Sequence, residues 1–164
     1  MEPSWLTIAK KYTGTAEVPG PGSNPKILAM AARFGGWVKS FFKDDDIPWC
    51  ALFVGSCLIE DGLKSTGSMS ARSYETWGQP LDVPSLGAVL VFSRKGGGHV
   101  GFYLGQKIDG TLRVFGGNQD NSVKASWISK DRLTAIRWPS EKMLPTSGPV
   151  ILAGDGQPVS TNEA

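Results

Sequence analysis

The hydrophobic residues of this chain change their spacing near residue 86, and that change limits the folds the chain can adopt. Before residue 86, apolar side chains recur every three or four residues, which is typical of amphipathic helices. After it they gather in short runs typical of strands, at residues 88–92, 100–104, 112–115, 123–127 and 133–138. Helices followed by antiparallel strands predict an α+β domain.

Residues that start and stop helices predict where the helical segments lie. Asn24-Pro25 supplies a cap and a proline suited to the first helical position, and Gly62 favours a C-terminal cap. With the apolar spacing, these signals predict four helices, over residues 5–13, 25–34, 50–62 and 71–77.

Length and composition fit one domain with a substantial core. The chain has 164 residues, of which 40% are hydrophobic, including six tryptophans, and this is the size of one ordinary domain. Beyond Pro139 the sequence becomes rich in Pro, Gly, Ser and Thr. We therefore predict a domain over residues 1–139 and a poorly ordered C-terminal extension over residues 140–164.

Charge and hydropathy argue against several classes of function. Lys and Arg total 17 against 15 Asp and Glu, and no basic block predicts binding to nucleic acid. No segment approaches the roughly 18 apolar residues of a membrane span, so we expect no membrane insertion. The N-terminus lacks the apolar run of a signal peptide. We therefore expect a protein made in the cytoplasm, which another system must release if its substrate lies outside. We also expect a monomer, although no sequence feature indicates the oligomeric state.

Two cysteines, Cys50 and Cys57, fall within one predicted helix. Seven residues of helix separate their Cα atoms by about 10.5 Å, whereas a disulfide needs less than about 7 Å, so the two should not pair. They are too few for a cysteine-rich zinc site. The acidic run at residues 44–46 lacks the alternating spacing of a calcium loop. We expect no metal and no cofactor.

Cys50 stands where the third helix is expected to start. A helix N-terminus carries partial positive charge and unpaired N–H groups, both of which favour a thiolate. Free cysteines are nevertheless most often small buried core residues, and this alternative stays open for Cys50. Cys57 lies two turns further along an apolar stretch, and we expect it to be core.

His99 is the single histidine of the chain, so any Cys–His mechanism must use it. If Asp109-Gly110 forms a two-residue hairpin turn, side-chain alternation brings His99, Asn118 and Asp120 to one face of the sheet. Either polar residue is then able to orient the imidazole, as the third member of a catalytic triad does. A bulge at Gly116-Gly117 breaks this alternation.

Five short motifs occur in an order that resembles one enzyme group. They are Asn24 to Ile27 (NPKI), Pro48 to Val54 (PWCALFV), Ala71 to Tyr74 (ARSY), Gly98 to Tyr103 (GHVGFY) and Gly116 to Gln119 (GGNQ). Across roughly residues 4–138 the chain resembles the NlpC/P60 and CHAP group of papain-like peptidoglycan hydrolases. It is most similar to a small subfamily found in phage lysins and bacterial cell-wall hydrolases.

The resemblance implies a papain-like fold and assigns three catalytic roles. Cys50 is then the nucleophile, His99 the general base and Asn118 the residue that orients the imidazole. The expected substrate is bacterial peptidoglycan, cleaved at an amide bond through a thioester. The chain departs from the group at residues 86–88, where Leu-Gly-Ala replaces a frequent Pro-Gly-Asp, so no acid at that position takes part.

Four further residues are candidate substrate contacts: Arg72, Trp49, Glu17 and Asp120. Arginine suits bidentate recognition of a stem-peptide carboxylate, although Arg72 serves equally well in a structural ion pair, and a tryptophan such as Trp49 is commonly core.

Three functional readings remain: a peptidoglycan endopeptidase or N-acetylmuramoyl-L-alanine amidase, a non-lytic cysteine acyltransferase or peptidase, and a silent wall-binding or virion module. The resemblance favours a phage endolysin released by a holin, and an effector delivered by a secretion machine is the alternative.

Overall fold

The structure is a computed structural model, and it describes residues 1–18, 24–34 and 48–163. The acidic run at residues 44–46, which we expected not to bind metal, lies outside the described residues. The described helices are α1 (Ser4–Lys10), α2 (Pro25–Phe34) and α4 (Cys50–Glu60), with two short 3-10 helices, η1 (Ala71–Thr76) and η2 (Lys130–Arg132).

Seven strands among the described residues form one sheet, in the order β1-β6-β2-β3-β4-β5-β7. Their bounds are β1 Gln79–Pro80, β2 Val89–Arg94, β3 Gly97–Gln106, β4 Leu112–Gln119, β5 Ser122–Ile128, β6 Leu133–Trp138 and β7 Val159–Ser160. Neighbouring strands run antiparallel except β5 and β7, which are parallel. The α+β class expected from the sequence is confirmed.

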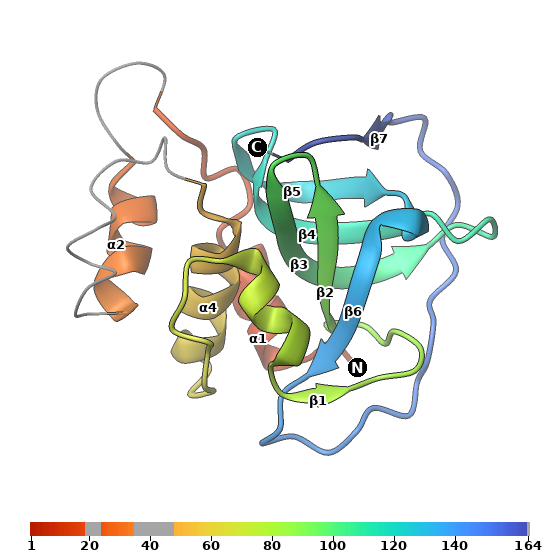
Figure 1. Ribbon diagram of the computed structural model, residues 1–164, viewed down its shortest axis with the longest axis horizontal. Helices are drawn as coiled ribbons and strands as arrows, with labels where there is room; N and C mark the ends of the chain where they lie inside the picture. The colour runs from red at the N-terminus through yellow and green to blue at the C-terminus, as the bar shows by residue number, and fades with distance from the viewer. Residues whose placement is uncertain (19–23, 35–47, 164) are drawn as a thin grey trace.

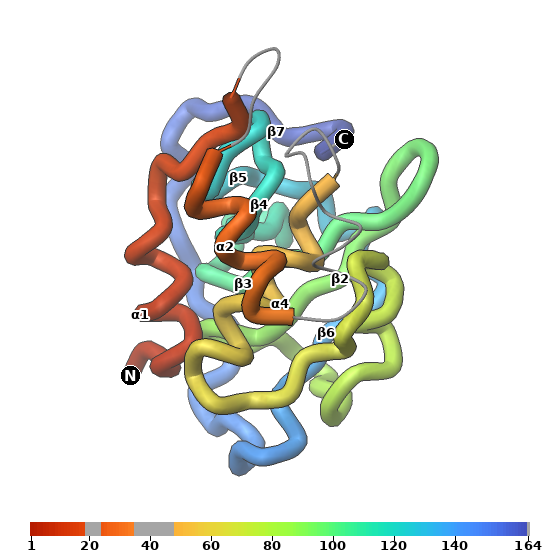
Figure 2. The backbone as a smooth tube through the Cα atoms, turned by 90° about the vertical axis from the view of Figure 1, so that its left-hand side faces the viewer, coloured from red at the N-terminus to blue at the C-terminus, as the bar shows by residue number. Residues whose placement is uncertain are grey.

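The helices lie together on one side of the sheet (Figure 1), and the view turned by 90° shows the same layering (Figure 2). Helix α4 contacts α1, α2, β3 and β4, and every residue from Cys50 to Leu58 is buried. A helix that is apolar all round belongs in the interior. Phe53 anchors it there through ring contacts with Phe102 and Phe115. The first residue of α4 is therefore held firmly against the sheet.

Both ends of α4 lie where the sequence predicts them. The helix begins at Cys50, and past its last residue Gly62 takes a φ of 78°. Gly62 N–H donates to the Ile59 carbonyl and Leu63 N–H to the Leu58 carbonyl, each at 2.9 Å. This paired pattern is the Schellman cap that glycine makes possible. Among the described residues no helix is long and apolar enough to cross a membrane.

The β3–β4 hairpin differs from its prediction. Its loop spans three residues, 108–110, because Gln106 pairs with Leu112 and Lys107 N–H donates to the Thr111 carbonyl. A second irregularity follows between Tyr103 and Gly105. The two-residue turn was wrong because Gly110, at a φ of 91°, closes the longer loop that a positive-φ residue also suits.

Residues 140–163 pack along the sheet, contrary to the expected loose extension. Val159 and Ser160 form β7 beside β5, and Ile151 bridges to Gln106. The Leu152 side chain lies against Gly105. The physical reason is that the ends of β3 and β5 offer unpaired backbone groups, which extended chain of almost any composition is able to bind.

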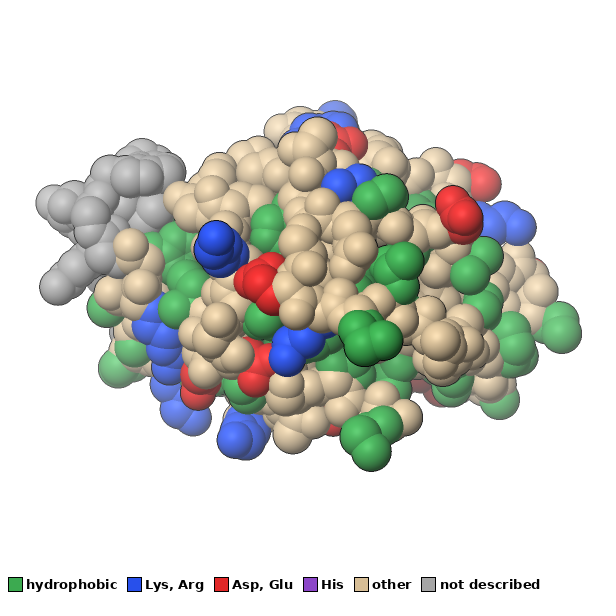
Figure 3. All heavy atoms as spheres, turned by 90° about the horizontal axis from the view of Figure 1, so that it is seen from below, with side chains coloured by type: hydrophobic (Ala, Val, Ile, Leu, Met, Phe, Trp, Pro, Cys, Tyr) green, Lys and Arg blue, Asp and Glu red, His purple; other side chains and the backbone are tan. Residues whose placement is uncertain are grey.

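The lower face in Figure 3 carries acidic and basic side chains interspersed with separate apolar groups. A surface of mixed sign gives no strong field of one sign over that face.

Candidate active site

The candidate site lies where the start of α4 meets strands β3 and β4. Cys50 is the first residue of α4, and His99 lies in β3, paired across the ladder with Phe92 of β2. His99 is fully buried and Cys50 is 5% exposed. The Phe92 ring lies 6.4 Å from the imidazole, centroid to centroid. The fold thus brings together two residues that are 49 positions apart in the chain.

Gln119, the last residue of β4, holds the imidazole. Its Nε2 donates to the backbone carbonyls of Val114 at 3.1 Å and Lys124 at 2.6 Å. Those two acceptors fix the amide so that Oε1 faces His99 Nε2, at 2.9 Å. Since Oε1 only accepts hydrogen bonds, Nε2 must carry a proton. The neutral imidazole therefore keeps the lone pair of Nδ1 for another partner.

The Cys50 thiol lies beside the imidazole. Among the described residues, His99 Nδ1 is buried and has no hydrogen-bond partner. Of the groups that raise the pKa of the ring, Cys50 acts most strongly. Such contacts are often loose before substrate binds. Because Gln119 occupies Nε2, Nδ1 is the ring nitrogen left to take a proton from the thiol.

The two groups shift each other's pKa in opposite directions. Burial alone raises the pKa of the Cys50 thiol, but hydrogen bonding to His99, the imidazolium charge and the N–H groups of Val100 and Ala51 outweigh it, and the pKa is lowered. Burial lowers the pKa of His99, but Cys50, Glu163 and Gln119 outweigh it, and the pKa is raised. Both directions favour a thiolate–imidazolium pair.

Two glycines make room for this arrangement. A Cβ on Gly116 meets Gln119 Oε1 at 2.8 Å, and a Cβ on Gly117 meets the Trp49 ring at 2.6 Å. Neither approach is tolerable for a real side chain, so glycine is required for close contact. The paired glycines of the GGNQ motif thereby leave space for the Gln119 carboxamide to reach His99 Nε2.

Among the described residues, Asn118 makes no hydrogen bond to His99, so in this structure another side chain takes the orienting position predicted for Asn118. The ladder is irregular between Gly116 and Gln119, and Asn118 takes a φ of 58°. This irregularity breaks the alternation of side chains that the prediction required. Asn118 Nδ2 instead donates to the backbone carbonyl of Glu163 at 3.2 Å. The residue that orients the ring is its neighbour Gln119, which the sequence motif contains but parity excluded.

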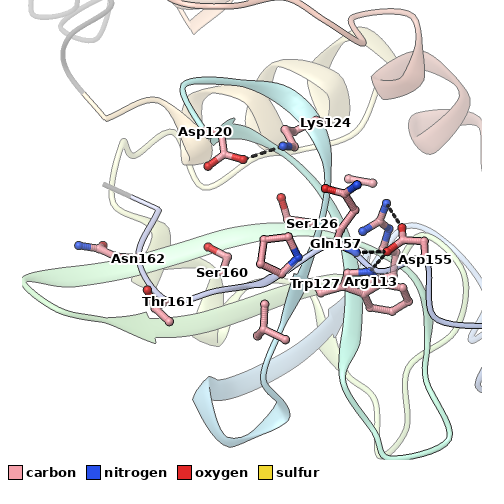
Figure 4. A pocket seen from close by; sticks show the side chains of 13 residues that line it. Arg113, Asp120, Lys124, Ser126, Trp127, Asp155, Gln157, Ser160, Thr161 and Asn162 are labelled. Carbon is pink, nitrogen blue, oxygen red and sulfur yellow. Dashed lines mark hydrogen bonds and ion pairs between the residues drawn. The ribbon is translucent and has the colours of Figure 1, made fainter.

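Asp120 also lies away from the imidazole. Its side chain is 80% exposed and binds Lys124 Nζ at 2.6 Å. Both residues line one end of a surface pocket between β5 and residues 155–162, while Asp155 and Arg113 pair at its other end (Figure 4). Asp120 is therefore a pocket residue and not a member of the candidate catalytic group.

The other predicted substrate contacts have structural partners. Trp49 is fully buried, and its Nε1 donates to Glu17 Oε1 at 2.8 Å. Arg72 on η1 is exposed, donates to the Gly97 carbonyl at 3.3 Å and pairs with Glu75 at 3.6 Å. Trp49 is therefore core, whereas Arg72 flanks the β3 glycines that precede His99.

The start of α4 supplies hydrogen-bond donors beside the thiol. The Cys50 N–H belongs to the first turn, whose N–H groups have no partner within the helix. Such a donor is suited to an oxyanion that forms on a carbon attached to Sγ. Among the described residues, no group of three or more His, Cys, Asp and Glu side chains is placed to hold a metal ion.

The chain matches no family model, no curated protein and no solved structure at a significant level. The geometry of Cys50, His99 and Gln119 therefore carries the functional inference.

Proposed function

We propose that this chain is a papain-like cysteine hydrolase that cleaves an amide bond of peptidoglycan, with Cys50 as nucleophile, His99 as base and Gln119 as the residue that orients the imidazole. The observation that carries the proposal is the buried Cys50–His99 pair at the start of α4, with Gln119 on the far side of the ring. A nucleophile, a base and a third group that fixes the base are the recurring elements of covalent acyl transfer.

The reaction begins when Sγ of Cys50 attacks the amide carbonyl carbon as a thiolate. The S–C bond forms, and the oxygen receives the carbonyl electron pair while the Cys50 N–H donates to it. The C–N bond then breaks, and the amine leaves with the proton that His99 held. Water attacks the thioester and gives a proton to His99. The S–C bond then breaks, which releases the carboxylic acid and restores the thiolate beside the protonated His99.

The choice of peptidoglycan rests on the five ordered motifs, and the chemistry rests on the site. The proposal includes release to the cell wall by a holin or a secretion machine. An endopeptidase cuts between stem-peptide residues, whereas an amidase cuts the bond from N-acetylmuramic acid to L-alanine.

The test uses purified peptidoglycan with the wild-type chain, Cys50→Ala and the matched control Cys57→Ala. We expect wild type and Cys57→Ala to lower the turbidity of the suspension, and Cys50→Ala to leave it unchanged while keeping the native circular dichroism spectrum. Mass spectrometry of released fragments then identifies the new termini and hence the bond. Full activity in Cys50→Ala contradicts the mechanism. If wild-type Cys50 reacts with a thiol-specific reagent but the wild-type chain leaves peptidoglycan intact, the proposed substrate is contradicted.

A further inference from the structure

Arg132 of η2 is a largely buried arginine whose fork of donors faces residues 159–163. Its Nε donates to the Ser93 carbonyl of β2 at 2.9 Å. Nη1 donates to the Ser160 carbonyl at 3.1 Å and to Glu163 Oε2 at 3.0 Å, and Nη2 contacts Glu163 Oε1. The guanidinium therefore binds the Glu163 carboxylate with both terminal nitrogens, the bidentate geometry that arginine favours.

Glu163 lies beside the candidate catalytic pair. Its side chain is 1% exposed, and its backbone carbonyl accepts a hydrogen bond from Asn118, the neighbour of Gln119. The carboxylate charge raises the pKa of His99, and the imidazole in turn lowers the pKa of Glu163. Figure 1 shows the segment beyond β7 running across the end of the sheet toward the β4–β5 turn. The Glu163 carboxylate thus lies close enough to His99 to affect its charge.

The Arg132 side chain also has an anchor outside this segment. The Nε hydrogen bond ties the side chain to β2, which belongs to the centre of the sheet. Within the described residues, the hydrogen-bond partners of Nη1 and Nη2, in contrast, all lie in residues 159–163. When those residues move away, a fixed cation loses its partners in a largely buried setting, which is costly unless another anion takes their place.

Asn118 supplies a second hydrogen-bond donor that would lose its partner if residues 159–163 moved away. Its Nδ2 donates to the Glu163 carbonyl, while its Oδ1 is buried and has no hydrogen-bond partner in the described part of the chain. Buried amide groups normally satisfy both ends. An incoming peptide brings backbone N–H and C=O groups able to bind both atoms, which a single carbonyl from Glu163 does not do.

We propose that Arg132 and Asn118 form a subsite for an acidic residue, with the carboxylate on Arg132 and the backbone on Asn118. Glu163 fills it in this structure, and an acidic residue of a peptide ligand fills it when residues 159–163 leave. The inference deepens the proposed function and rests on it for one point, that the ligand is the substrate. The substrate class is then a peptide that carries a free carboxylate close to the scissile amide.

The test reads binding without any turnover, from the NMR signals of the His99 imidazole, which is the single histidine of the chain. The probes are N-acetyl-glutamate amide and its neutral match, N-acetyl-glutamine amide. Glu163→Gln weakens the binding of residues 159–163 to Arg132. Asp155→Ala weakens the attachment of the same segment further from the site, because it removes contacts to Trp127 and Arg113. Glu141→Gln, whose carboxylate accepts from Lys64 N–H, is the matched control.

We expect saturable shifts of the His99 signals with the acidic probe in Glu163→Gln and, more weakly, in Asp155→Ala. The neutral probe should bind at least about fivefold more weakly, because charge-assisted hydrogen bonds are stronger than neutral ones. Wild type and Glu141→Gln should respond least. Adding Arg132→Gln to Glu163→Gln should abolish the preference for the acidic probe.

Equal response to both probes, no response in either opened variant, or an acidic preference that survives Arg132→Gln overturns the subsite. None of these outcomes depends on hydrolysis. A preserved acidic preference in a chain that cleaves no peptidoglycan contradicts the proposed function and leaves the subsite standing, so the two failures are distinguishable.

Discussion

The two cysteines of α4 stand seven residues apart in one buried helix, and their chemistry diverges. Cys50 has a lowered pKa because His99 and nearby N–H groups outweigh its burial. Cys57 has a raised pKa, first because of burial and then because of the negative charge of Glu60. Both thiols are free and both are buried. Burial is thus common to the two thiols, whereas of the two only Cys50 has a neighbouring imidazole and a position at the helix start.

The difference follows from the geometry of a helix. N–H groups of the first turn point toward Cys50, whereas those near Cys57 are used by the helix itself. The partial positive charge of the N-terminus also falls off within one turn. A cysteine two turns along gains none of this stabilisation, so the same residue type in the same helix stays a neutral thiol.

Removal of the imidazole should make Cys50 resemble Cys57. In His99→Ala we expect hydrolysis to fall at least about 1,000-fold, since base and leaving-group acid are lost together. The pKa of Cys50 should rise because burial then acts unopposed. Steady-state rates on wall peptide and the pH profile of Cys50 alkylation measure the two effects. An unchanged alkylation profile contradicts the pairing of the two residues.

Labelling compares the thiols directly. With iodoacetamide at pH 7, Cys50 should react at least about 100-fold faster than Cys57, because the thiolate is the nucleophile. Peptide mapping by mass spectrometry gives both rates in one sample, and Cys57 should react readily in urea. Comparable rates in the folded protein remove the distinction between the two positions.

Gln119 should matter more than Asn118. Gln119→Ala frees the imidazole to rotate and lose its tautomer, and we expect kcat to fall about 10- to 100-fold, as for other residues that orient a functional histidine. Asn118→Gly, which tolerates the positive φ, should lower kcat by no more than a few fold. Both variants need only steady-state kinetics. The reverse order restores Asn118 as the orienting residue.

Activity should depend on pH in a bell shape. The rate falls as pH falls through the Cys50 pKa, which lies below its usual value of about 8.5, because the thiolate gains a proton. It falls as pH rises through the His99 pKa, above its usual value of about 6.5, because the imidazolium is lost. Rates should change about tenfold per pH unit on each limb. In Glu163→Gln the alkaline limb should move to lower pH.

Cys57→Ala should have the smallest effect. We expect activity to be retained and the free energy of unfolding to fall by about 1–2 kcal/mol, from a lost buried contact. Urea denaturation followed by fluorescence measures the loss. A large loss of hydrolysis at native stability assigns Cys57 a role that its position does not suggest.

Local signals allowed the sequence to predict the frame of the site. Helix α2 has the expected bounds, and Asn24 Oδ1 accepts from Lys26 N–H at 2.9 Å, as a cap should. The start of α4 at Cys50 follows from the proline and apolar run, and its end from Gly62. These features depend on neighbouring residues, so a single sequence is enough to predict them.

The orienting residue was not predictable by strand parity. An irregularity of one residue moves every side chain beyond it to the other face, and the β4 ladder is irregular between Gly116 and Gln119. The two adjacent glycines were the one sequence feature that pointed to Gln119, since residues without a side chain allow a carboxamide to pack closely against them. The sequence narrowed the choice to one motif, and tertiary packing selected Gln119 over Asn118.

The path of residues 140–163 was missed for another reason. Composition indicates how readily a segment bends, but it does not reveal which sheet edges elsewhere in the fold are open. The pairing of Arg132 with Glu163 joins positions 31 residues apart, and nothing near either residue in the sequence indicates it. Contacts of this kind follow from the assembled sheet alone.

The order of the site residues along the chain also determines when the Cys50 thiol becomes reactive during synthesis. Cys50 leaves the ribosome well before His99 and Gln119, and the amide that fixes the imidazole is itself held by the Lys124 carbonyl. Until that part of the chain has emerged and folded, the thiol has no base and keeps its ordinary pKa. The Cys50 thiol of a nascent or partly unfolded chain is thus less reactive, and its lowered pKa arises only as the finished domain closes around it.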